Sequence, residues 1–168
     1  MNLKGLLTLL FPPRARERIV ADGKNRLCAL LTPRPFPVSG FEGVALLPYA
    51  DETVQAFVIE SKYHGNKRAQ EALGEVLADY LLERMADDES FAKKSYALVP
   101  VPLSPSRRKE RGYNQVEEIC LRALARLGKT LAPMPDLLSR VKDTLPQTSL
   151  SAEARRTNVR EAFQASRP

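Results

Sequence analysis

The sequence predicts an α/β fold in which a parallel sheet is flanked by helices. Residues 96–103 form a short apolar run without alternating polarity, which is typical of a strand buried on both faces. An amphipathic helix pattern follows from Asn114, and a second strand and helix follow over residues 137–160. Strands and helices in this alternating order predict right-handed crossovers between parallel strands.

Composition agrees with one globular unit and indicates the charge of its partner. The 168 residues are 43% apolar, which is enough for a real core. The net charge of +6 is uneven, because residues 1–92 carry −2 and residues 93–168 carry +8. A basic C-terminal half predicts an anionic partner, either a phosphorylated metabolite or a nucleic acid. Composition leaves both open.

Residues 1–40 are expected to form an N-terminal segment ahead of a domain at residues 41–168. Leucines at helical spacing in Met1–Phe11 predict a short amphipathic helix, too brief to span a bilayer. Five prolines between residues 12 and 37 predict a connector without a long helix or a central strand. Two cysteines and one histidine supply neither a disulfide framework nor a zinc site, so we expect no zinc and a cytoplasmic location.

The first half of the domain contains one weak strand signal and two clear helix signals. Val44–Tyr49 is a short apolar run that predicts a strand. Glu52–Lys62 carries apolar residues on one face and predicts a helix, which Tyr63–Asn66 should break. Arg68–Met85 has a continuous apolar stripe and is the strongest helix signal here. The strand over residues 96–103 contains two prolines, so it should end in an irregular loop.

Helix signals in the second half lie at the helix ends. Asn114 predicts an N-cap, Glu117 three residues later completes a capping box, and Gly128 predicts the end of this helix. The remaining elements are expected to be a strand at Leu137–Val141, a polar loop at Asp143–Leu150 and a helix capped by Ser151 that runs to about Arg160.

The strongest candidate site is the cationic segment Ser104–Gly112. It is predicted to be a loop after a buried strand, which is where open α/β sheets bind ligands. Gly112 permits an unusual backbone, and the start of the next helix adds free amides and a partial positive charge. A guanidinium suits phosphate because it donates two parallel hydrogen bonds. A solvated basic loop without a ligand is an equally good interpretation. The candidate phosphate- or pyrophosphate-binding residues are Arg107, Arg108, Lys109, Arg111 and Gly112.

Two weaker candidates contain further cations and hydroxyls. The polar loop could fold over an anionic ligand, although an ordinary surface loop is the favoured alternative. Its candidate residues are Lys142, Thr144, Gln147 and Thr148, and the candidate secondary anion contacts are Lys62, Tyr63 and Arg156. His64 is not expected to be catalytic, and Cys120 is expected to be a small buried hydrophobe on its helix.

Four stretches carry a resemblance to a known family. They are FPPR (Phe11–Arg14), SKYHG (Ser61–Gly65), VPVPLSPSRRKERGYNQ (Val99–Gln115) and RVKDTLPQTSLSAEARRTNVREAF (Arg140–Phe163). Over about residues 44–163, the chain resembles the ComF family of bacterial competence proteins, which are related to type I phosphoribosyltransferases.

The resemblance implies a fold, a ligand and a biological setting. It implies a type I phosphoribosyltransferase-like parallel sheet with a site for phosphoribosyl pyrophosphate, accompanied by Mg²⁺ in a complete protein. Ser104–Gly112 resembles the pyrophosphate-facing loop, and Lys142–Leu150 resembles the loop that closes over the site. ComF proteins are associated with the uptake of transforming DNA. The competing interpretation is therefore a non-catalytic protein that binds single-stranded DNA, with Tyr63 or Tyr113 stacking on bases.

Two departures from the family pattern limit these expectations. ComF proteins usually begin with paired cysteines in zinc-ribbon spacing, and here only Cys28 lies in that region. They also continue beyond the stretch matched by Phe163 into an Asp-Asp pair and a Thr/Gly-rich loop that hold the phosphoribosyl group. No Asp-Asp followed by Thr-Thr-Gly occurs in this sequence. We therefore expect a sheet that is incomplete at the C-terminus and a catalytically incompetent chain, whether it is a fragment or a truncated relative.

Overall fold

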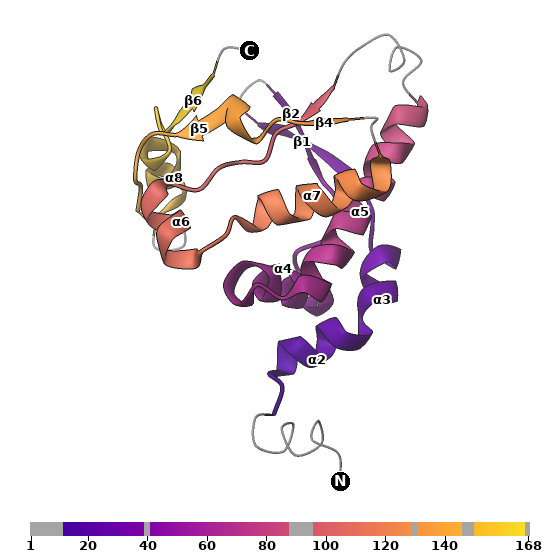
Figure 1. Ribbon diagram of the computed structural model, residues 1–168. Coiled ribbons are helices and arrows are strands. Elements are labelled where there is room, and N and C mark those ends of the chain that lie inside the picture. Colours follow the sequence, from indigo (N-terminus) through magenta and orange to yellow (C-terminus); the bar gives the residue numbers. More distant parts are fainter. Residues whose placement is uncertain (1–11, 39–40, 88–95, 129–130, 146–149, 167–168) are drawn as a thin grey trace.

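The computed structural model describes residues 12–38, 41–87, 96–128, 131–145 and 150–166 and shows a mixed helical and strand fold (Figure 1). The helix expected at residues 1–11 lies outside this part of the chain. The helices are α2 (Ala15–Asp22), α3 (Lys24–Ala29), α4 (Glu52–His64), α5 (Lys67–Asp87), α6 (Pro105–Arg111), α7 (Gln115–Leu127), the 3₁₀ turn η2 (Pro135–Leu137) and α8 (Ala152–Asn158). The strand pairs are β1 (Arg34–Val38) with β2 (Phe41–Ala45), β3 (Ala97–Leu98) with β4 (Ala132–Pro133) and β5 (Leu138–Arg140) with β6 (Phe163–Ala165).

Local end signals explain the helices that the sequence predicts correctly, namely α4, α5, α7 and α8. Asn114 caps α7 by accepting a hydrogen bond from the Val116 N–H at 3.0 Å. Ser151 caps α8 in the same way. Gly65 ends α4 with a left-handed φ of 58°, which glycine adopts without steric cost. Glu117 is not used as the capping box would use it, because its carboxylate pairs with Arg108.

The N-terminal connector is more ordered than the sequence predicts. Its prolines exclude a long helix, but two short helices, α2 and α3, form between them. Val20 and Leu27 from these helices are buried in the same core as α4 and α5. The prolines of β1 are tolerated because this strand belongs to an antiparallel hairpin of two strands, where missing amide donors cost little. The strand expected at Val44–Tyr49 begins earlier, as β2.

The extended parallel sheet is present only in part. β3 pairs in parallel with β4, and α6 and α7 lie on the chain between these two strands. β3 ends at Leu98 because the prolines that follow supply no amide donors. The strand predicted around Leu137–Val141 forms as β5, but it pairs antiparallel with β6. The described residues therefore contain one parallel pair of two-residue strands in place of the phosphoribosyltransferase-like sheet that we expected.

Two apolar clusters form the core, and α5 contributes to both. The first joins α2, α3, α4 and the first half of α5, with Phe57 fully buried at its centre. The second joins the second half of α5 to α7 and includes Leu127 and Leu131. Figure 1 shows α7 lying across α5. Hydrophobic burial on both halves of α5 thus fixes α7, and the basic helix α6 before it, relative to α4.

The crossing of α5 and α7 depends on Gly74. A Cβ atom at this position would lie 2.6 Å from Cβ of Arg122 and 3.0 Å from the carbonyl oxygen of Ile119. Such distances leave no room for a side chain. The glycine therefore allows the two helices to approach closely, and it sets where the N-terminus of α7 meets the α4–α5 turn.

Candidate functional site

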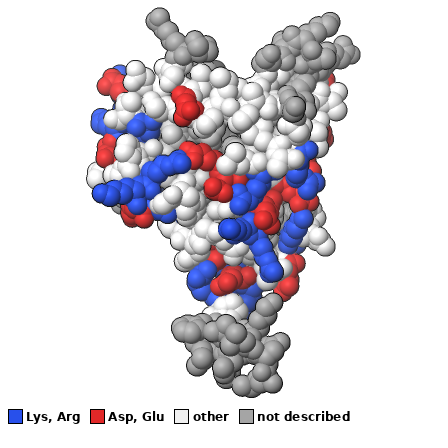
Figure 2. Space-filling model, viewed as in Figure 1, with Lys and Arg blue, Asp and Glu red and all other residues white. Residues whose placement is uncertain are grey.

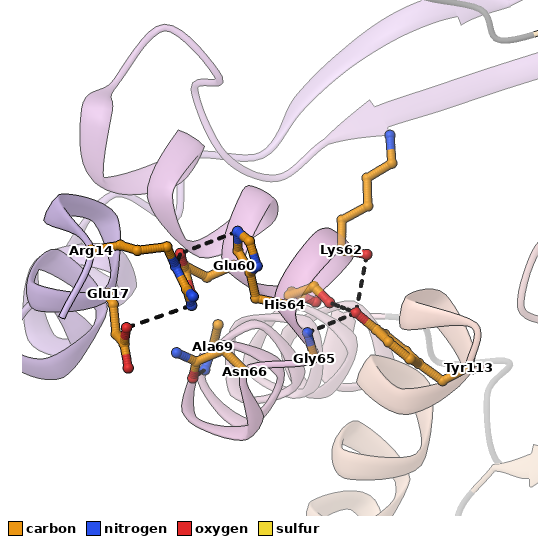
Figure 3. Close-up of polar contacts among 10 residues, drawn as sticks. Arg14, Glu17, Glu60, Lys62, His64, Gly65, Asn66, Ala69 and Tyr113 are labelled. Atoms are coloured by element: carbon orange, nitrogen blue, oxygen red, sulfur yellow. Dashed lines mark hydrogen bonds and ion pairs between the residues drawn. The ribbon is translucent and has the colours of Figure 1, made fainter. Parts of the chain in front are cut away.

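Tyr113 joins two of the motifs that the sequence singles out. Its hydroxyl accepts a hydrogen bond from the Gly65 N–H at 2.8 Å. It also donates toward the carbonyl oxygens of Ser61 and Lys62, at 2.9 and 3.0 Å (Figure 3). These carbonyls lie in the last turn of α4, where backbone acceptors lack helical partners. Tyr113 therefore caps α4 from the side and fixes the SKYHG turn against the start of α7.

Asn114 extends this connection to the strand exit. It is 1% exposed, and its amide donates to the carbonyl oxygen of Val101 at 2.9 Å while its oxygen caps α7. Both polar ends of a buried amide are thus satisfied. Tyr113 and Asn114 together hold the loop after β3 and the α4–α5 turn in one place.

The cationic segment Ser104–Gly112 is a helix rather than the predicted loop. Pro105 occupies the first turn of α6, where a missing N–H costs nothing, and Gly112 ends the helix with a φ of 80°. The free amides expected before α7 are also less available. Asn114 caps that end, and Glu117 and Glu118 place negative charge in the first turn.

Ion pairs and hydrogen bonds engage several of the predicted anion-binding cations. Arg108 lies 2.5 Å from the Glu117 carboxylate. Arg107 lies 3.4 Å from that of Glu110. Arg111 donates to the Gln115 side chain at 2.5 Å. Lys109 is exposed on α6 and has no ion pair among the described residues.

A groove beside α6 brings together cations from distant parts of the sequence. It encloses about 760 Å³. Arg108 and Lys109 of α6 line it together with Arg140 of β5, and the acidic lining residues are Glu117 and Asp136. The remaining lining residues are mainly proline and leucine, namely Pro102, Leu103, Pro105, Pro135, Leu138 and Ser139. The groove therefore has polar, mainly cationic groups on partly apolar walls, an arrangement typical of small-molecule sites.

Arg140 is the residue of this groove that sequence reasoning missed as a ligand. Its guanidinium donates to the Thr144 hydroxyl and lies 5.4 Å from the centre of the Phe163 ring. Its Nε is buried without a hydrogen-bond partner. A buried donor without an acceptor is costly, so this atom is well suited to an added anionic acceptor. Its position in the RVKDT motif was the available signal.

Two serines and an aspartate form a second polar cluster at the start of α6. Ser106 Oγ donates to Asp143 Oδ1 at 2.6 Å and lies 3.2 Å from Ser104 Oγ. The hydroxyls of Ser104 and Ser106, followed by the charges of Arg140 and Arg107, hold the pKa of Asp143 below its usual value. Both serines lie in the predicted cationic segment Ser104–Gly112, but neither was among its candidate binding residues.

A third cluster joins the SKYHG turn to the end of α6. Tyr63 is 56% exposed. Lys62 Nζ lies 5.0 Å from its ring centre, and Arg111 Cζ lies 5.7 Å from it. The structure thus brings Arg111 next to Lys62 and Tyr63, two predicted contacts from a distant part of the sequence. Tyr113 differs, because its hydroxyl is used within the protein and only Tyr63 offers an exposed ring here.

The predicted closing loop is only partly described. Lys142 is exposed on it, and Thr144 accepts the hydrogen bond from Arg140. Gln147 and Thr148 lie outside the described residues. Arg156 belongs to α8, but its side chain is likewise outside the described part.

A further ion pair joins Arg14 of the FPPR motif to Glu60, the residue before the SKYHG motif. Glu60 is 1% exposed, and Arg14 donates to its two oxygens at 3.1 and 2.9 Å (Figure 3). Burial raises the pKa of Glu60, but the hydrogen bonds and charge of Arg14 outweigh it, so this pKa lies below its usual value. His64 Nε2 lies 3.9 Å from the same carboxylate. His64 is thus part of a structural ion-pair cluster.

Surface charge, the cysteines and possible metal ligands complete the description. On the face shown in Figure 2, Lys and Arg are interspersed with Asp and Glu rather than gathered in one basic field. Burial raises the pKa of Cys120 to about 11, in agreement with its predicted place in the core. Within the described ranges, no three His, Cys, Asp or Glu side chains gather as a metal site. No helix among the described residues is long and apolar enough to cross a membrane.

Comparison with known proteins finds a curated relative. Competence protein F of Haemophilus influenzae is 36% identical to this chain over 84 residues. This similarity supports the resemblance to the ComF family. The matched stretch is half of this chain and 36% of that protein, so the chain spans about a third of the ComF relative it matches. No family model and no solved structure matches the chain.

Proposed function

We propose that this chain is a ComF-like, phosphoribosyltransferase-type domain that binds phosphoribosyl pyrophosphate or a related diphosphate and serves a competence-related role. The relationship to competence protein F supports the setting. The observation that carries the ligand class is the groove in which Lys109 and Arg140, neither of which forms a salt bridge among the described residues, meet beside the exit of β3.

The chemistry of the groove fits a phosphate-bearing ligand. Arg140 offers a planar group with an unpartnered Nε, and Lys109 offers a point charge. In a transfer reaction the same cations would stabilise a departing pyrophosphate.

Mg²⁺ is proposed to enter with the diphosphate rather than to reside in the protein. Mg²⁺ is often held by substrate phosphates and waters with only one or two carboxylates.

Calorimetric titration with phosphoribosyl pyrophosphate and Mg²⁺ tests the proposal. We expect micromolar binding that weakens about tenfold or more in Lys109→Met and Arg140→Met, because each change removes a direct phosphate contact worth roughly 1.5–3 kcal/mol. Arg16→Met removes the same charge from an exposed site on α2 and serves as the control. Absence of binding, or equal weakening in the control, would refute the proposal.

The second candidate function is single-stranded DNA binding, supported by the exposed Tyr63 ring between Lys62 and Arg111. An aromatic ring beside cations is a stacking platform for a base. The interspersed charges of Figure 2 offer no long backbone track on that face. A salt titration separates the candidates, since DNA affinity falls steeply with salt and Tyr63→Ala should weaken DNA binding alone.

A further inference from the structure

The carboxylate of Asp143 contacts hydrogen-bond donors of the kind that bind phosphate. It accepts the hydrogen bond from Ser106, whose hydroxyl is within 3.2 Å of that of Ser104. Arg107 and Arg140 lie close enough for their charges to act on it. Hydroxyl and guanidinium donors are the groups with which proteins hold phosphate oxygens. Asp143 is therefore a part of the chain that accepts hydrogen bonds from donors suited to an anionic ligand.

The next residue along the chain accepts a hydrogen bond from a second donor in the same region. Thr144 accepts from the guanidinium of Arg140, which also lines the groove of the proposed ligand. Two consecutive residues thus accept hydrogen bonds next to the groove, Asp143 from Ser106 of α6 and Thr144 from Arg140 of β5. Ser104 is 1% exposed, so its hydroxyl is held in place, whereas Asp143 is exposed and held by polar contacts.

We propose that Asp143 is an internal competitor of the anionic ligand. Its carboxylate occupies the Ser104–Ser106 hydroxyl pair in the free protein, and it leaves when a phosphate group binds there. This inference rests on the proposed function, because the hydroxyl pair flanks Pro105, which lines the proposed groove. It identifies Asp143 as the residue that accepts these hydrogen bonds when no ligand is bound.

Competition of this kind lowers the apparent affinity in a predictable way. A ligand that binds only the open arrangement has its dissociation constant raised by the inverse of the open fraction. If the carboxylate holds the hydroxyl pair in about nine molecules of ten, removal of its charge tightens binding about tenfold. This gain in affinity should require the Ser106 hydroxyl, which the ligand would contact in place of Asp143.

The test is calorimetric titration of the full chain with inorganic pyrophosphate and, in parallel, with inorganic phosphate. Asp143→Asn keeps the shape of the side chain and removes the charge, and we expect it to bind about tenfold more tightly than the wild type. Glu153→Gln makes the same change in net charge on the exposed surface of α8 and should differ from the wild type by less than about twofold. Ser106→Ala combined with Asp143→Asn should lose the gain.

The outcomes separate this inference from the proposed function. Wild-type binding with no greater effect of Asp143→Asn than of Glu153→Gln would overturn the internal competitor and leave the ligand site standing. A gain that persists without the Ser106 hydroxyl would also overturn it, as a general charge effect. Absence of binding in every folded variant, checked by circular dichroism, would refute the ligand site and the competitor together.

Discussion

At the scale of single residues, Tyr113 holds the site together although it touches no ligand in the proposal. Its hydroxyl meets one amide and two carbonyl oxygens of the SKYHG turn. The sequence shows that this tyrosine follows Gly112, but a contact across 48 positions depends on the packing of α5 against α7. Local patterns carry no information about such a distance, so the capping role of Tyr113 could not be predicted from the sequence.

Replacement of Tyr113 by phenylalanine should lower the free energy of unfolding by about 1–3 kcal/mol. The change removes a partly buried hydroxyl that accepts from the Gly65 amide and donates toward the Ser61 and Lys62 carbonyl oxygens. Urea denaturation measures the effect, and amide exchange at Gly65 should accelerate in the native state. Tyr49→Phe makes the same change on a 59% exposed side chain and should be neutral. Equal stability of the two variants would contradict the capping role.

At the scale of elements, the sequence predicts best those features whose cause is local. The ends of α7 and α8 follow from their capping residues, and both were predicted. Helix α6 was missed because its seven residues carry no apolar periodicity. Pro105 at its start and Gly112 after its end together signal a short helix. β4 could not be predicted, since two residues ending in Pro133 carry no strand periodicity.

The ion pair between α2 and α4 gives an element-scale prediction. Arg14→Ala leaves the Glu60 carboxylate buried without its partner, so we expect a loss of about 1–3 kcal/mol near pH 7. Arg16→Ala on the same helix is the control and should change stability by less than about 0.5 kcal/mol. Urea denaturation of the three proteins measures both values.

The same pair predicts a dependence on pH. The folded pKa of Glu60 lies below its ordinary value, so its contribution is present above the ordinary pKa of about 4.3 and is lost as the pH falls through the folded pKa. In Arg14→Ala, burial is opposed only by the weaker effects of His64 and the Asn66 side chain, so we expect the pKa of Glu60 to rise. The difference between wild type and variant should therefore shrink below about pH 4. A difference that is independent of pH would contradict this account.

At the scale of the whole molecule, one long helix connects two apolar clusters. α5 packs on α2, α3 and α4 with its first half and on α7 with its second. The basic helix α6 and the proposed groove lie beyond α7, so their position depends on both clusters. This arrangement was only partly predictable, because the apolar stripe of α5 was evident but its two sets of partners were not.

Truncation in either cluster should destabilise the same cooperative transition. Phe57→Ala in the first cluster should cost about 3–5 kcal/mol, and Leu127→Ala in the second about 2–5 kcal/mol. Far-UV circular dichroism and tyrosine fluorescence, recorded through one thermal melt, should coincide for each variant. Two separated transitions would show that α5 does not couple the clusters.

The glycine at the helix crossing has a consequence for recognising relatives of this chain. A side chain in the aligned column of position 74 would place its Cβ 2.6 Å from Cβ of Arg122, so the two helices would have to shift at their crossing. A shift of α7 would also move its tyrosine relative to the turn that it caps. That column therefore separates sequences that share only the motifs from those that share the geometry joining them.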